Sequence, residues 1–285
     1  MLEKEHGALR QPLDLFPKRK DEGKLGQDCP VQLQQGWARL TALLVVAALM
    51  PWPLLITHDN WWAFVLVTAA IVAALRLLLG RQWTDYAGLN LSPTHVLIVV
   101  AAFAVVATGS EVLLPIVYKT AALKANALTI EEQTGMMFQA FNEEIFFRAL
   151  MIGFFIQYVR SALMISLGLA FLFAAAHFLL YRFGTLHMAL SMASLATLFF
   201  AGVAWNNLYL AFRHIGFSWA LHAGWNVVWL PAAFYDASTN ERLHEPQVFD
   251  RVLGSPTMLA VTCAMAVLSF VFLVRRPGAK ARPLA

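Results

Sequence analysis

The stretch FNEEIFFRAL, residues 141–150, places two carboxylates and a guanidinium inside an apolar, aromatic-rich run. Glu144 and Arg148 are four residues apart with the acid first, which is the favourable order for an ion pair along a helix. Glu143 lies about 100° around the helix from Glu144, so it need not share that arginine. We interpret Glu144 and Arg148 as a structural clamp and Glu143 as the reactive carboxylate. Two alternatives stay open: Arg148 serves both acids, or the ion pairs only orient the helix.

Two later apolar runs also carry polar side chains. His177 follows Phe173 by one helical turn in FLFAAAHFLL, and His222 and Asn226 are four residues apart in LHAGWNVVW, so they project to one side of a helix. Gly224 lies between them and can permit close approach of another helix. Each set alone is explained by packing or by an interhelical hydrogen bond. One shared polar cavity explains all of them more simply.

Carboxylates and imidazoles are the side chains that activate water, and an asparagine amide can donate to a developing oxyanion. The set therefore fits hydrolysis of a peptide bond inside a membrane. Other hydrolase signatures are missing from the sequence: the two-histidine zinc motif H-E-x-x-H, a pair of aspartates within apolar segments, and the G-x-S-x-G elbow. A hydrolase would have to depend on the glutamates and histidines.

The composition indicates the environment in which these residues act. The chain has 285 residues, of which 59% are hydrophobic and 13% are charged, and its mean hydropathy is +0.61. Soluble domains average about 25% charged residues, so an integral membrane protein is expected. Nucleic acid is not an expected partner, because basic residues form no patch interleaved with aromatic ones. The two cysteines, Cys29 and Cys263, predict neither a disulfide nor a metal knuckle.

A membrane-spanning helix needs about 20 mostly apolar residues. The fold class is therefore predicted as all-α, a polytopic membrane protein of about eight transmembrane helices that enclose a polar intramembrane cavity. The first helix contains Pro51 and Pro53, and we expect it to kink or to end early. The expected helices cover residues 37–57, 61–80, 94–118, 136–157, 162–181, 188–212, 217–235 and 257–274.

Residues 1–36 read as a polar, disordered cytoplasmic tail, residues 37–274 as the transmembrane domain, and residues 275–285 as a basic cytoplasmic tail. With both termini in the cytoplasm, most lysines and arginines lie on the inner side, as the positive-inside rule requires. We expect a multi-pass protein of a bacterial inner (plasma) membrane. The loop at residues 236–256 would lie outside, as a connector or a lid.

This orientation places Glu143 and His177 in the outer half of the membrane and His222 nearer the inner end of its helix. The three can meet only if the helix over residues 217–235 begins earlier or if the helices tilt. If the cavity opens outward, a secreted or membrane-anchored protein with a C-terminal sorting helix suits it better than a cytoplasmic prenylated C-terminus.

The three motifs resemble those of a known protein family. EEIFFR matches E-E-x-x-x-R, FAAAH matches F-x-x-x-H and HAGWN matches H-x-x-x-N. Their order and separation resemble the CPBP family, the intramembrane proteases that include CAAX prenyl protease 2 and the bacteriocin-processing, Abi-type proteins. The similarity covers residues 136–232, the expected protease core. The resemblance implies an eight-helix fold around a water-filled active-site cavity.

The resemblance also implies roles for individual residues. Glu143 would be the base, His177 would assist with the water, and His222 with Asn226 would form the oxyanion site, supported by Glu144 and Arg148. A glutamic mechanism needs no cofactor. Zinc is the alternative, held by Glu143, His177 and His222, and asparagine is a rare zinc ligand but a good oxyanion donor.

The predicted function is that of an intramembrane endopeptidase that cleaves a membrane-anchored protein with a hydrophobic or lipidated C-terminal region. Two alternatives remain. One is a non-catalytic membrane scaffold or immunity factor on the same fold. The other is a proton-coupled transporter, which would also bury ionisable residues along a path. Six other polar residues are expected to serve loops, caps or interfaces: His95, Glu111, His187, Asn206, Asn207 and His214.

Overall fold

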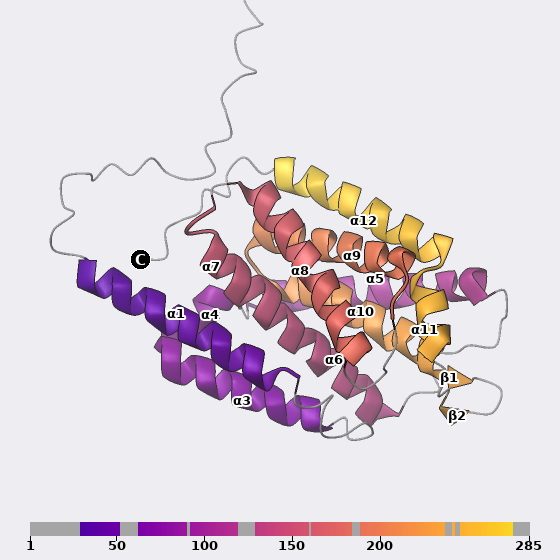
Figure 1. Cartoon of the computed structure of the whole chain (residues 1–285), viewed down its shortest axis with the longest axis horizontal. Helices are drawn as coiled ribbons and strands as arrows, with labels where there is room; N and C mark the ends of the chain where they lie inside the picture. The colour runs from indigo at the N-terminus through magenta and orange to yellow at the C-terminus, as the bar shows by residue number, and fades with distance from the viewer. Residues whose placement is uncertain are drawn as a thin grey trace, which may run out of the picture.

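The computed structural model describes residues 29–51, 62–89, 92–118, 129–159, 161–183, 189–236, 241–242 and 246–275. The fold within these ranges is almost entirely helical (Figure 1). Its long helices are α1 (Cys29–Leu49), α3 (Trp62–Leu79), α5 (Pro93–Tyr118), α6 (Ile130–Glu144), α8 (Ala162–Phe183), α9 (Met192–Phe212), α10 (Ile215–Phe234) and α12 (Pro256–Arg275). The short elements are η1 (Gly80–Gln82), α4 (Trp83–Ala87), η3 (Ile145–Ile152), α7 (Gly153–Phe155), α11 (Pro246–Leu253), β1 (Tyr235–Asp236) and β2 (Glu241–Arg242).

The chain is a polytopic membrane protein, as the composition predicted. Among the described residues, five helices are long and apolar enough to cross a membrane: α3, α5 over Pro93–Leu113, α8, α9 and α12 over Pro256–Val274. The other three predicted segments are also helical, in α1, in α6 with its continuation through η3 and α7, and in α10. That all eight segments cross the membrane stays a prediction.

Several helix boundaries differ from the predicted ones. Helix α1 starts at Cys29 and ends at Leu49, before Pro51, so it ends early as predicted, and Pro53 lies outside the described residues. Helix α6 starts at Ile130, upstream of the predicted residue 136, because Thr129 caps it. The Thr129 hydroxyl accepts a hydrogen bond from the Glu132 amide at 3.2 Å, and the Glu132 carboxylate accepts one from the Thr129 amide at 2.9 Å. This capping box satisfies amides that helices otherwise leave unpaired.

The predicted loop at residues 236–256 contains structure of its own. Strands β1 and β2 pair in an antiparallel hairpin, with Tyr235 opposite Arg242, and helix α11 follows. This hairpin is a small exception to the all-α prediction. Helix α11 is tied to the start of α9, because the Asp250 carboxylate accepts hydrogen bonds from the Ser191 amide at 2.8 Å and the Ser194 hydroxyl at 2.6 Å.

The helix formed by α6, η3 and α7 occupies a central position among the others. Helices α3 and α10 pack against α6, helices α1 and α8 pack against η3, and α9 lies between α8 and α12 (Figure 1). Helix α10 also packs along α5. Side chains carried by α6 and η3 can therefore meet groups from α8, α9 and α10.

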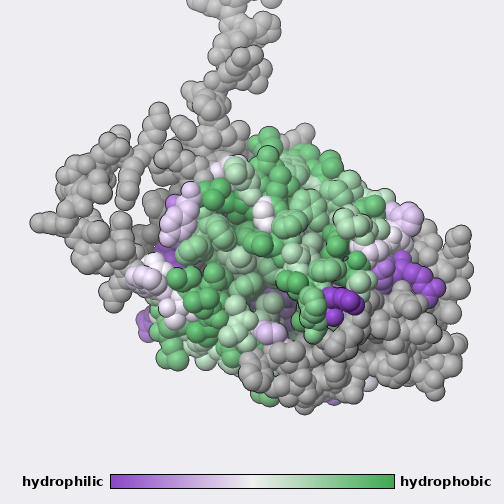
Figure 2. All heavy atoms as spheres, viewed as in Figure 1, coloured by the Kyte–Doolittle hydropathy of each residue, from purple (hydrophilic) through white to green (hydrophobic). Residues whose placement is uncertain are grey.

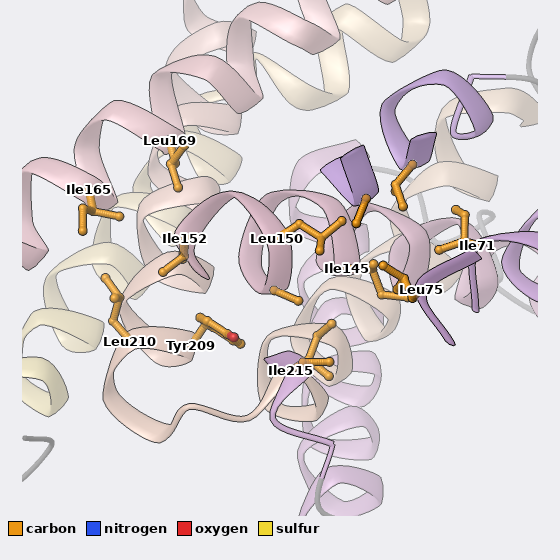
Figure 3. Close-up of a cluster of buried hydrophobic side chains, with 14 residues drawn as sticks. Ile71, Leu75, Ile145, Leu150, Ile152, Ile165, Leu169, Tyr209, Leu210 and Ile215 are labelled. Carbon is orange, nitrogen blue, oxygen red and sulfur yellow. The ribbon is translucent and has the colours of Figure 1, made fainter. Parts of the chain in front are cut away.

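Segment η3 is a π-helix that begins directly after Glu144. Its i→i+5 hydrogen bonds widen the helix, and such insertions occur frequently at functional sites. Apolar side chains hold it in place. Ile145, Leu150 and Ile152 are buried against residues of α3, α8, α9 and α10, and Figure 3 shows this cluster. The acidic pair thus lies at the junction of a regular helix and a firmly packed irregular one.

The outer surface suits a lipid environment. The face in Figure 2 is hydrophobic over most of its described area, with hydrophilic residues mainly toward the left and right margins. Large apolar side chains are exposed on helices that a membrane would surround, for example Leu66 at 70%, Val105 at 71% and Leu77 at 85%. Exposed apolar area on this scale would be costly in water and is stable against acyl chains.

Candidate active site

The two adjacent glutamates face different partners. Glu144 Oε1 lies 3.1 Å from Arg148 Nη1, and both side chains are completely buried. This ion pair is the clamp that the spacing predicted. Glu143 is buried as well, at 7% exposed, but it does not pair with Arg148. Its Oε1 accepts a hydrogen bond at 3.2 Å from Gln139, which lies one turn earlier on α6.

Glu143 Oε2 is directed toward two imidazoles from other helices. It lies 3.8 Å from His177 Nε2 on α8 and 3.7 Å from His222 Nε2 on α10. Oε2 is buried without a hydrogen-bond partner. Both separations exceed a direct hydrogen bond but suit a bridge through one water molecule. The structure therefore brings together the three side chains that the sequence assigned to one cavity.

The other nitrogen of each imidazole has a defined partner. His177 Nδ1 lies 2.9 Å from the Phe173 carbonyl oxygen, and His222 Nδ1 lies 2.8 Å from Glu144 Oε1. Carbonyl and ionised carboxylate oxygens only accept, so each Nδ1 is the donor. In the neutral rings, both Nε2 atoms are then acceptors that can receive a proton from water.

Helix α10 starts earlier than predicted, which is one of the two ways in which the sequence allowed the three side chains to meet. This helix begins at Ile215, two residues before the predicted residue 217.

Helix α10 contacts α5 very closely at Gly224, where an added Cβ would lie 3.0 Å from the Phe103 carbonyl oxygen and 3.2 Å from Val106 Cβ. The absence of a side chain at this position lets α10 approach α5, as the sequence predicted.

Two cavities meet at Glu143. The first has a volume of about 50 Å³ and is lined by residues of α6, α8, α9, α10, α11 and α12, including Asn226 and His222. The second has a volume of about 210 Å³ and is lined mainly by apolar residues, which come from α1 and the turn after it, α3, η3 and α8. Gln139, Glu143 and His177 line both cavities. A molecule that extends from one cavity into the other would pass the carboxylate.

Aromatic side chains pack around the Glu144–Arg148 ion pair. The Trp205 ring of α9 stacks on the His222 ring, with centroids 4.1 Å apart and an interplanar angle of 16°. The guanidinium carbon of Arg148 lies 4.8 Å from the Phe173 ring centroid and 5.2 Å from that of Trp205. Cation–π attraction partly replaces the hydration that Arg148 lost on burial. Trp205 therefore contacts both the charged clamp and the histidine.

Residues 133–228 match the family described as Rce1-like, type II CAAX prenyl endopeptidase Rce1-like. Over this segment, the chain is similar to the CAAX prenyl endopeptidases. No curated protein and no solved structure matches the chain.

The segment shared with the CAAX prenyl endopeptidases contains all three motifs found in the sequence. It begins within α6 and ends within α10, so it includes the glutamates, both histidines and Asn226. The buried cluster of Glu143, Glu144 and His222 is consistent with the catalytic site of this family. The catalytic roles of the individual residues stay predictions.

Metal binding was considered for the same donors. Within the described ranges, no three His, Cys, Asp or Glu side chains are grouped so that they could hold a metal ion. The donor set also includes His222, whose Nδ1 is engaged by Glu144 and whose Nε2 faces Glu143. An imidazole held by a carboxylate through Nδ1 keeps Nε2 available as a ligand, so zinc dependence stays open to measurement.

Three of the six remaining polar candidates serve the helix scaffold. Asn206 donates to the Ser166 carbonyl oxygen at 2.8 Å, which joins α9 to α8. Asn207 accepts from the Ser166 hydroxyl at 2.7 Å and donates to the Ser269 hydroxyl at 3.0 Å, which joins α9 to α8 and α12. His214 Nδ1 accepts from the Gly216 amide at 3.0 Å at the start of α10.

The other three of these candidates have less defined surroundings. His95 contacts the Ser92 hydroxyl at 2.5 Å and stacks on His214, so it too lies outside the acidic site. Glu111 is exposed, and His187 lies outside the described residues.

Sequence reasoning missed several residues that line the first cavity. Gln139 could have been found, because it precedes Glu143 by one helical turn. Trp229 could have been found in the same way, because it follows Asn226 by three residues, but Thr197 and Trp205 had no such mark in the sequence. Tryptophans and threonines are common in membrane helices, and only packing reveals which of them face a cavity.

Proposed function

We propose that the chain is an intramembrane endopeptidase of the CAAX type that cleaves a peptide bond near the C-terminus of a membrane-anchored protein. The observation that carries this proposal is the unpartnered Glu143 Oε2, which faces His177 Nε2 at 3.8 Å and His222 Nε2 at 3.7 Å in a buried cavity. A non-catalytic scaffold would not require an unpartnered buried carboxylate that faces two imidazoles.

The proposed reaction begins with a water molecule between these groups. Glu143 takes one proton from the water while His177 Nε2 accepts a hydrogen bond from its other proton. The water oxygen attacks the carbonyl carbon of the scissile bond and forms a tetrahedral oxyanion. Glu143 then delivers its proton to the amide nitrogen, and the carbon–nitrogen bond breaks. Water is consumed, and a carboxylic acid and an amine are formed.

The oxyanion needs donors where its charge develops. The Asn226 amide can donate without any change of charge, and it lines the same cavity as Glu143. His222 Nε2 can donate only when its ring carries a second proton, because Nδ1 already donates to Glu144. The Glu144 carboxylate, 2.8 Å away, would stabilise that imidazolium.

The substrate class follows from the family and the cavities. CAAX prenyl endopeptidases, by their name, act on prenylated C-terminal sequences, which supports a substrate with a lipidated or hydrophobic C-terminal region. The cavity of about 210 Å³ beside Glu143 has a mostly apolar lining that suits such a group. Two substrate forms fit: a prenylated C-terminus, or a membrane protein with an apolar C-terminal helix.

The test is accumulation of an uncleaved membrane substrate in cells that carry Glu143→Gln or His177→Asn. Removing a general base or its partner typically costs about 10²–10⁴ in rate, so processing should be lost. Glu131→Gln is the matched control, because Glu131 lies in the first turn of α6, away from the site. It should process substrate normally, and all variants should be as abundant as the wild type.

Wild-type processing by Glu143→Gln would reject the catalytic assignment and favour a non-catalytic scaffold. Metal analysis of the purified protein, with activity measured before and after chelation, separates a glutamic mechanism from a zinc-dependent one. Activity that survives chelation, in protein without stoichiometric metal, is expected.

A further inference from the structure

We propose that Thr197, Trp205 and Trp229 form a hydrogen-bond-donor subsite that binds oxygen atoms of the substrate beside the scissile bond. This inference rests on the proposed function. All three residues line the cavity of about 50 Å³ that also contains Glu143. They come from α9 and α10 and lie outside the three sequence motifs.

The three side chains are buried and have unsatisfied polar atoms. Thr197 is 1% exposed, and Trp205 and Trp229 are each 3% exposed. Thr197 Oγ1, Trp205 Nε1 and Trp229 Nε1 have no hydrogen-bond partner among the protein atoms. Leaving such groups unpaired is unfavourable. A ligand with acceptor atoms would satisfy them.

The chemistry of the three groups defines that ligand. An indole N–H can only donate, and a threonine hydroxyl can donate as well as accept. The complementary groups are therefore carbonyl or carboxylate oxygens. A cavity of about 50 Å³ has room for more than one water-sized group. It can therefore hold a carboxylate or a main-chain carbonyl.

Because Glu143 lies where the two cavities meet, different parts of one substrate would occupy the two cavities. Glu143 and His177 line the small cavity and the larger, mostly apolar one. A peptide whose scissile carbonyl lies at Glu143 has one neighbouring part on each side. The apolar part would enter the larger cavity, and the oxygen atoms on the other side would meet the three donors.

Two sources of these oxygen atoms share the same chemistry. One is the terminal carboxylate of a substrate cut near its C-terminus, and the other is a main-chain carbonyl of a longer substrate. Two fluorescent probes distinguish them: a prenylated peptide of CAAX form with a free carboxylate, and the same peptide ending in a carboxamide.

Binding is measured by fluorescence anisotropy with the full-length protein in lipid nanodiscs. Every variant carries Glu143→Gln, so the probe stays intact and the result does not depend on cleavage. The subsite variants are Thr197→Val, Trp229→Phe and the two combined. Trp205 is left unchanged, because it also stacks on His222. Thr197→Ser keeps the hydroxyl, and Thr262→Val removes a hydroxyl that only bonds the Met258 and Leu259 carbonyls within α12.

We expect Kd to rise about three- to tenfold for each subsite variant, as for loss of one hydrogen bond. Thr197→Ser and Thr262→Val should bind as the Glu143→Gln protein does. If the terminal carboxylate is the ligand, the carboxamide probe should bind more weakly than the carboxylate probe to protein with Thr197 and Trp229 intact. The double variant should then bind the two probes with the same Kd. If main-chain carbonyls are the ligand, both probes lose affinity equally.

The inference is overturned if the folded double variant binds both probes with unchanged Kd, which would assign the three donors to bound water alone. Absence of binding by either probe to the Glu143→Gln protein would also overturn it. Failure of the proposed function is a separate result, because it is measured as cleavage by protein with Glu143 intact.

Discussion

His222 connects the two glutamates that the sequence places side by side. Its Nδ1 donates to Glu144 Oε1 at 2.8 Å, and its Nε2 lies 3.7 Å from Glu143 Oε2. Glu144 thus orients both Arg148 and His222, and Glu143 is left facing the cavity. An imidazole held by a carboxylate through one nitrogen presents the other nitrogen in a defined direction, as in many enzyme and metal sites.

This division predicts different outcomes for changes at the two acids. Glu144→Gln removes the charge that compensates Arg148, and both side chains are completely buried. Breaking a buried ion pair typically costs about 3–5 kcal/mol, because an uncompensated charge remains. We expect a clearly lower unfolding temperature of the purified protein in detergent and lower abundance in the membrane.

The matched comparison is Glu143→Gln, which makes the same carboxylate-to-amide replacement at the neighbouring residue. Glu143 pairs with no arginine in the described structure. The unfolding temperature of Glu143→Gln should therefore stay close to that of the wild type. Equal destabilisation of both variants would contradict the separation into a clamp and a reactive carboxylate.

At the scale of elements, the site depends on how closely α10 approaches its neighbours. Helix α10 carries His222 and Asn226, and it packs along α5 and α6. The Trp219 indole donates to the Met137 carbonyl oxygen at 2.9 Å and links α10 to α6. Small residues allow membrane helices to pack at short distance, and van der Waals contact then contributes much of the stability.

Gly224→Ala should disturb this packing. The added Cβ would lie 3.0 Å from Phe103 O and 3.3 Å from Ala107 N, which are backbone atoms that cannot turn aside. Overpacking of this kind costs about 1–3 kcal/mol. Gly168→Ala on α8 is the control, because nothing lies within 4 Å of its added Cβ. The unfolding temperature should fall for Gly224→Ala and stay unchanged for Gly168→Ala.

Activity gives a second measure of the same contact. If α10 moves away from α5, His222 also moves relative to Glu143, so processing by Gly224→Ala should fall. Normal stability and normal processing in this variant would show that the close approach is not required.

At the scale of the whole molecule, the polar site is enclosed by helices whose outer faces are apolar (Figure 2). The exposed apolar area and the five long apolar helices explain why the chain contains few charges. Buried ionisable residues are expensive inside a membrane and are generally directed toward the protein interior. The glutamates, Arg148 and His222 follow this rule, since each is at most 7% exposed.

Orientation in the membrane is a prediction of the lysine and arginine distribution. Reporter fusions at residue 187 and at the C-terminal residue 285 should report the outer and the cytoplasmic side, respectively. A cytoplasmic signal at residue 187 would reverse the predicted orientation. It would also favour a cytoplasmic prenylated C-terminus over a secreted protein as substrate.

The sequence by itself determined the polytopic helical class, the polar residues inside apolar segments and the Glu144–Arg148 pair. These features are local: they depend on composition and on the 3.6-residue repeat of a helix, which places residues four apart on one face. The close approach at Gly224 could be anticipated because glycine has no side chain to keep another helix away.

Only the tertiary structure decided which groups meet across helices. Glu144 and His222 are 78 residues apart in the chain, and their contact depends on how α10 packs against α6. The same holds for Trp205 stacked on His222, and for the unpaired donors of α9 and α10 in the cavity. No helical repeat relates these residues, because the relative position of two helices is set by the shapes of all the side chains packed between them.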